Sequence, residues 1–68
     1  KLTAAHPTLP LGTRVKVVNL DNNKSVVVKI NDRCLEHEDV FIDLSREAAR
    51  KIGMTGKGKA NVRISVVD

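Results

Sequence analysis

Three side chains of this sequence have the chemistry of acid–base catalysis: His6 and Asp32, at the borders of valine-rich segments, and Asp43, on a neighbouring predicted strand. Asp32 ends a valine-rich run, and Asp43 stands between Ile42 and Leu44. Imidazole and carboxyl groups at such borders can converge on a cleft, where they donate and accept protons. We therefore predict Asp32, His6 and Asp43 as the catalytic candidates.

Each of these candidates also has an ordinary structural interpretation. The oxygen of Asp32 can cap a turn, which is a common use of an Asn-Asp pair. Asp43 can accept hydrogen bonds from main-chain amides near the start of a helix. Outside a functional context His6 is an exposed loop residue, although Pro7 restricts its backbone to an extended form. The sequence leaves these alternatives open.

The candidates for substrate binding are Arg33, Thr8 and Asn31. The forked donors of Arg33 suit a sugar hydroxyl or a peptide carboxylate, and equally suit a surface ion pair. Lys57, Lys59 and Arg63 concentrate positive charge near the C-terminus, where they can attract an anionic glycan or form a solvated face.

One polar segment contains several side chains that bind metals elsewhere: Cys34, Glu36, His37, Glu38 and Asp39. Their spacing fits no recognised metal site, so a solvated loop is favoured and no metal is predicted. Cys34 is the single cysteine, which excludes an intrachain disulfide and makes an idle thiol the default interpretation.

The elements that must position these residues are mostly strands. Apolar residues alternate with polar ones in four segments, residues 13–19, 25–30, 39–44 and 61–67. The first two are joined by residues 21–24, whose types favour a tight reversal, so they form a hairpin. A short helix begins after Ser45, a good N-cap, and ends at Gly53.

These elements predict a mainly β fold: a small barrel with one short α-helix. Four strands are few for closure, and open edges invite aggregation. We therefore expect at least one further strand, formed by residues before Thr13 or supplied by a second copy of the chain.

Composition restricts the class of partner. The 68 residues carry a formal net charge of +4, which favours an anionic partner. Nucleic acid ranks low because single-strand sites usually add stacking aromatics, and Phe41 is the single aromatic residue. No apolar run reaches the roughly 20 residues of a membrane span, and no targeting signal is recognised.

The order of motifs resembles the double-psi β-barrel domain of the rare lipoprotein A family. The shared stretches are Thr-Ala-Ala-His at residues 3–6, Leu-Pro-Leu-Gly at 9–12, Asn-Asp-Arg at 31–33 and Ile-Asp-Leu-Ser at 42–45. The resemblance implies one domain over residues 1–68, lacking its first strand segment, and a cell-envelope location as a lipoprotein.

The resemblance also implies an activity. The family's characterised members are lytic transglycosylases, which cleave peptidoglycan glycan strands to 1,6-anhydro products without a cofactor. Asp32 corresponds to the catalytic aspartate, which is expected to be partly buried so that its pKa is raised. Where the family has Gly-Pro after Asn-Asp-Arg, this chain has Cys34 and Leu35.

Two other functions compete with this one. A noncatalytic, expansin-like module would bind the same glycan without turnover. A basic barrel would bind nucleic acid or a protein partner, with a steep dependence on salt.

Overall fold

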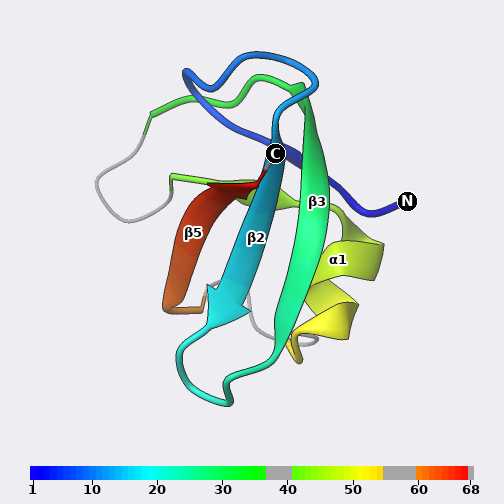
Figure 1. Ribbon diagram of the computed structural model, residues 1–68, viewed down its shortest axis with the longest axis vertical. Helices are drawn as coiled ribbons and strands as arrows, with labels where there is room; N and C mark the ends of the chain where they lie inside the picture. The colour runs from blue at the N-terminus through cyan, green and yellow to red at the C-terminus, as the bar shows by residue number, and fades with distance from the viewer. Residues whose placement is uncertain (37–40, 55–59, 68) are drawn as a thin grey trace.

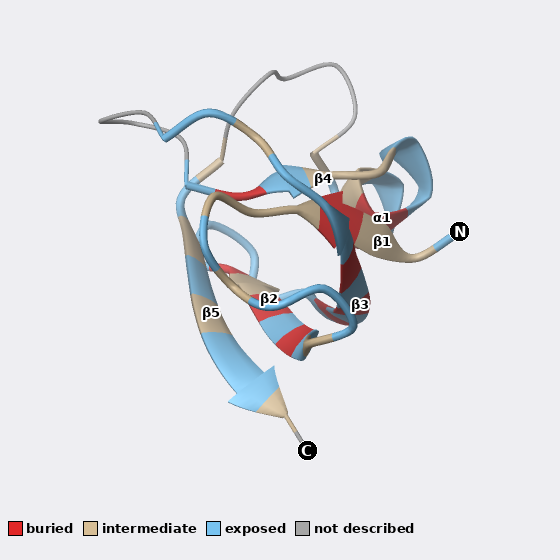
Figure 2. Ribbon diagram, turned by 90° about the horizontal axis from the view of Figure 1, so that it is seen from above, coloured by how far each residue is buried: buried red, intermediate tan, exposed pale blue. Residues whose placement is uncertain are grey.

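Alternating apolar residues form two of the three longest strands, β2 (Arg14–Asn19) and β3 (Ser25–Asp32). The computed structural model describes residues 1–36, 41–54 and 60–67. Val15 pairs with Val28 and Val17 with Val26 in an antiparallel hairpin, and all four side chains are buried. Figure 2 shows the resulting bands of buried and exposed residues along both strands. The predicted hairpin is confirmed.

The hairpin lies inside a five-stranded sheet with the order β4-β1-β3-β2-β5; Figure 1 labels its β3, β2 and β5, and Figure 2 labels all five strands. Strand β1 (Thr3–Ala5) runs parallel to β3, and β4 (Asp43–Leu44) is antiparallel to β1. Strand β5 (Val62–Val67) is antiparallel to β2. The further strand expected before Thr13 is therefore β1.

Helix α1 (Arg46–Lys51) covers the inner face of the sheet beside β3 and β4. Ala48 and Ile52 are fully buried and join the valines of the hairpin in one core. Gly53 ends the helix with a φ of +76°, and a Cβ there would lie 2.8 Å from Asn22 Nδ2. The predicted helix and its N-cap are confirmed, and the helix ends at Lys51, two residues before the predicted Gly53.

The hairpin turn is fastened to the end of this helix. Asn23 has a positive φ of 63°, as expected for a tight reversal. The side-chain amides of Asn19 and Asn22 both donate to the carbonyl oxygen of Ile52, at 2.8 and 3.0 Å. These bonds give the buried Asn19 a partner and fix the helix relative to the hairpin.

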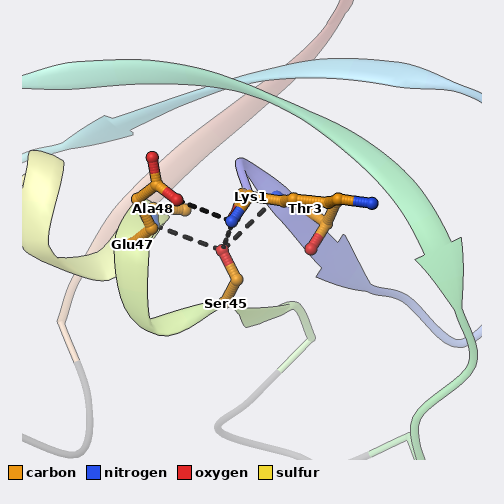
Figure 3. A network of polar contacts seen from close by, with 5 residues as sticks. All are labelled: Lys1, Thr3, Ser45, Glu47 and Ala48. Carbon is orange, nitrogen blue, oxygen red and sulfur yellow. Dashed lines mark hydrogen bonds and ion pairs between the residues drawn. The ribbon is translucent and has the colours of Figure 1, made fainter.

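Ser45 joins β1 to the start of the helix (Figure 3). Its Oγ accepts from the backbone N–H groups of Ala48 (3.2 Å) and Thr3 (3.3 Å), and donates to the carbonyl oxygen of Lys1 (2.6 Å). Beside it, the main-chain nitrogen of Lys1 lies 2.6 Å from Glu47 Oε1. One hydroxyl therefore holds together two elements that are distant in sequence.

Replacing Ser45 tests this junction. Ser45→Ala removes the cap and the bonds to Thr3 and Lys1, so we expect a loss of about 1–2 kcal/mol in the free energy of unfolding. Urea denaturation of the two proteins measures the difference. Ser45→Thr keeps a hydroxyl and should lose much less; equal losses in the two variants would contradict this role for the hydroxyl.

Two expectations need correction. The strand expected over residues 39–44 is shorter in the described part, because Phe41 and Ile42 precede the two-residue strand β4; Asp39 and Val40 lie outside the described residues. The strand expected to end at Ile30 continues to Asp32, because β1 gives it a second partner. The fold is mainly β, and β4 and β5 form the edges of a sheet that does not close within the described residues.

Candidate active site

Two of the predicted acids lie in one row at an end of the sheet. Ala5 of β1 pairs with Asp32 of β3 on one side and with Asp43 of β4 on the other. Adjacent strands are about 4.8 Å apart, so the Cα atoms of Asp32 and Asp43 are about 10 Å apart. Both side chains are exposed. The sheet therefore brings together carboxyl groups that are separated by ten residues in sequence.

His6 joins the same end of the sheet because it follows β1 directly. Its backbone N–H donates to the carbonyl oxygen of Asp32 at 3.1 Å. Its ring Nδ1 accepts from the backbone N–H groups of Thr8 (3.1 Å) and Leu9 (3.0 Å). A nitrogen that accepts two hydrogen bonds carries no proton, so these bonds assign the neutral ring its proton at Nε2. His6 is thus a positioned N–H donor, and its backbone contacts that of Asp32.

Arg33 fastens the loop that follows His6. Its Nη1 donates to the carbonyl oxygens of Leu9 (2.5 Å) and His6 (3.3 Å). A turn from Pro10 to Thr13, with Gly12 at a φ of +96°, continues the loop, and Gly12 N–H donates to the Ile30 carbonyl oxygen at 2.7 Å. In Figure 1 this loop and the segment after β3 lie together at the top of the sheet. Arg33 therefore has a positioning role that its sequence context did not indicate.

The two carboxylate oxygens of Asp32 differ in their contacts. Its Oδ1 accepts from the backbone N–H of Arg33 at 2.8 Å, which is the turn-capping interaction considered from the sequence. Within the described residues no hydrogen bond occupies Oδ2. The side chain is exposed, so Asp32 lacks the partial burial that was expected of a general acid. The reason is that Asp32 is the last residue of β3, at the end of the sheet rather than inside it.

The pKa of the Cys34 thiol indicates that the carboxylates of Asp32 and Asp43 both lie near this side chain. Partial burial is the main cause that raises the pKa of its thiol, and the negative charges of Asp43 and Asp32 raise it further. The thiol therefore stays protonated at neutral pH and is a poor nucleophile. A charge on either acid reaches the same sulfur, so both acids lie near Cys34.

This neighbourhood can be tested through the thiol. Asp43→Asn removes a negative charge that raises the pKa of Cys34, so we expect a larger thiolate fraction and alkylation by iodoacetamide at pH 8 that is about two- to fivefold faster. Mass spectrometry follows the reaction. Asp21→Asn, in the distant hairpin turn, is the control and should leave the rate unchanged. Equal rates in all three proteins would contradict the proximity of Asp43 and Cys34.

The remaining candidates differ in their placement. Thr8 and Asn31 are exposed residues next to His6 and Asp32, so they stay at this end of the sheet. Arg63 lies away from it, because it pairs with Val18 near the opposite end of β2. Several residues of the two loops considered above lie outside the described residues: His37, Glu38, Asp39, Lys57 and Lys59.

Comparison with known proteins shows which family the chain is similar to. A family model described as lytic transglycolase matches residues 1–64. Endolytic peptidoglycan transglycosylase RlpA from Vibrio cholerae is 56% identical over 66 residues, 97% of this chain and 25% of the relative. The proteins of the same name from Helicobacter pylori and Pseudomonas aeruginosa are 57% and 51% identical, over 96% and 98% of this chain and 21% and 20% of theirs.

The chain spans about a quarter or less of the length of these curated relatives. Nearly all of its own length is matched, and the motifs at His6, Asp32 and Asp43 fall inside the matched residues. On this similarity, and on its mainly β fold with one short helix, the chain belongs to the lytic transglycolase family of double-psi β-barrel domains.

Proposed function

We propose that this chain is the catalytic domain of a peptidoglycan lytic transglycosylase, which cleaves glycan strands to 1,6-anhydro products during cell-wall remodelling and septation. The observation that carries the proposal is the convergence of Asp32, His6 and Asp43 at one end of the sheet. Similarity to proteins named endolytic peptidoglycan transglycosylase supports the substrate and the reaction.

In this proposal Asp32 carries out both proton transfers. Its carboxyl group, protonated at Oδ2, donates to the glycosidic oxygen as the bond from C1 of N-acetylmuramic acid breaks. The 6-hydroxyl of the same sugar attacks C1, forms the 1,6-anhydro ring and returns its proton to Oδ2. The acid is regenerated and no water is consumed. Because Asp32 is exposed, the bound glycan must itself exclude water from the carboxyl group.

The neighbours of Asp32 have supporting roles in this proposal. His6 presents Nε2–H as a donor to a sugar oxygen, since Nδ1 is occupied by the loop. Arg33 keeps that loop against the end of β3, and Thr8 and Asn31 supply polar contacts for the glycan. Asp43 contributes a second negative charge, which stabilises positive charge that develops at C1.

A noncatalytic glycan-binding function is the second candidate. The exposure of Asp32 favours it, because the side chain lacks the partial burial that was expected of a general acid. In that case the same residues would bind the glycan without breaking it.

The wider setting of the domain is also a proposal. We infer that residues 1–68 form one RlpA-like domain whose sheet is completed by a further strand, from another segment or a second copy, because β4 and β5 leave two edges. Action on peptidoglycan implies a place in the cell envelope, and the resemblance to the rare lipoprotein A family implies a lipoprotein of the outer membrane. Among the described residues, no helix has the length and apolar character needed to cross a membrane.

Product analysis tests the proposal. The protein is incubated with glycan strands freed of peptides, and the soluble products are analysed by mass spectrometry. We expect fragments that are one water lighter than hydrolysis products, because the ring closes within the sugar. Hydrolysis products would assign a glycosidase instead. Binding to insoluble glycan with no soluble product would assign the noncatalytic function.

A further inference from the structure

The outward face of β3, β2 and β5 carries a cluster of four cationic side chains, Arg14, Lys16, Lys29 and Arg63. We call it the cationic face. Each of the four is exposed and alternates with buried or half-buried residues, so all point away from the core. Arg14 pairs with Lys29 across the hairpin, and Lys16 lies two residues further along β2. Arg63 is diagonal to Lys16 on β5.

Within the three strands that carry it, the cationic face is not balanced by acids. The single acidic residue in these three strands is Asp32, the last residue of β3. Arg14 and Lys29 stand directly opposite each other, and like charges at paired positions destabilise a sheet. No ion pair involves these four residues within the described part of the chain. An arrangement that disfavours folding in this way is expected where an anionic ligand offsets the repulsion.

We propose that the cationic face binds the carboxylates of peptide stems on the cell-wall polymer, as a surface distinct from the residues that cleave the glycan. The identity of the polymer rests on the proposed function. Lys29 is three residues from Asp32 on the same strand, and Thr3 of β1 pairs with Lys29. The cationic face therefore continues from the candidate active site across the sheet, where peptide stems from a neighbouring strand can lie.

The chemistry of the cationic face fits carboxylates better than nucleic acid. It contains no aromatic side chain on which bases could stack; its exposed apolar residue is Val27, which pairs with Lys16. Two of its cations, Lys16 and Lys29, are point charges that accept single carboxylates in many orientations. The spacing between paired positions, about 5 Å, suits separate charged groups on a flexible peptide.

Binding to cell-wall sacculi tests the proposal. All proteins carry Asp32→Asn, so that binding is measured without cleavage. One variant adds Lys16→Gln, Lys29→Gln and Arg63→Gln; the matched control adds Arg46→Gln, Arg50→Gln and Lys51→Gln on the exposed face of α1. Both triples lower the net charge equally. A third triple, Lys16→Arg, Lys29→Arg and Arg63→Lys, keeps the charge. Circular dichroism checks the fold of each variant.

We expect affinity for peptide-bearing sacculi to fall about tenfold in the Gln triple on the cationic face, and less than twofold in the helix triple. The charge-keeping triple should bind normally, and 0.3 M NaCl should weaken binding of the parent. Sacculi stripped of peptides by an amidase should bind the parent about as weakly as intact sacculi bind the first triple.

Three results would overturn the proposal. Equal losses in the two Gln triples would show that net charge alone matters. Equal binding to intact and peptide-free sacculi would remove the carboxylates as ligands. Tighter binding to phosphatidylglycerol vesicles than to intact sacculi would assign the cationic face to a membrane surface. None of these measurements depends on turnover, so they stand apart from the test of the glycan-cleaving function.

Discussion

Asp32→Asn is expected to abolish the release of anhydro products while the protein keeps its fold. The proposed reaction uses one carboxyl group as acid and then as base, and such proton transfers contribute about a hundred- to ten-thousandfold to rate. An amide can do neither. We therefore expect kcat to fall at least a hundredfold on peptide-free glycan strands, measured by mass spectrometry of the soluble products.

Asp32→Asn should preserve the local structure, because the turn after β3 uses only one oxygen of the Asp32 side chain. Its Oδ1 accepts from the backbone N–H of Arg33, and the side-chain carbonyl oxygen of Asn can accept the same bond. The turn after β3 should survive, and with it the contacts from Arg33 to the loop. The matched control is Asp21→Asn, an exposed acid in the hairpin turn, which should retain full activity. Activity above a tenth of normal in Asp32→Asn would place the acid elsewhere, with Asp43 as the next residue to replace.

Local patterns predicted those parts of the fold that local interactions determine. The alternation of valines around Val15 and Val28 requires one face to be buried, and Ser45 and Gly53 mark the helix ends by their own backbone chemistry. The pairing of β1 with β3 depends on a partner 26 residues away, and three small residues carry no periodicity that would reveal it. The sequence therefore predicted an additional strand without its position in the sheet.

In the candidate site too, local patterns predicted some features and long-range contacts determine the others. His6, Asp32 and Asp43 were recognised by type and by resemblance, and the sheet places them at one end. The prediction that Asp32 is partly buried was wrong, because burial depends on the surfaces around a strand end and not on the strand itself. The contact from Arg33 to the Leu9 carbonyl oxygen spans 24 residues, and no local pattern identifies it. The cationic face likewise emerges only from the register of β2 with β3 and β5.

The two nitrogens of His6 have different roles, and two substitutions separate them. Nδ1 accepts from the backbone N–H groups of Thr8 and Leu9, which shapes the loop, whereas Nε2–H is the donor proposed to contact the substrate. In His6→Asn the side-chain oxygen can still accept the bonds from residues 8 and 9, as in an Asx turn, but the distal donor is lost. In His6→Gln the amide N–H₂ reaches about as far as Nε2, but the acceptor near the loop is lost.

We expect His6→Asn to unfold at the same urea concentration as the parent and to lose about ten- to a hundredfold in kcat/KM, the effect of one buried hydrogen bond of about 1.5–3 kcal/mol in the complex. His6→Gln should lose about 1 kcal/mol in the free energy of unfolding and retain more activity than His6→Asn. Urea denaturation and product release from glycan strands, measured on the same preparations, give both quantities. The opposite ranking, with the Asn variant the more active, would mean that His6 acts by shaping the loop and that its Nε2–H does not contact the glycan.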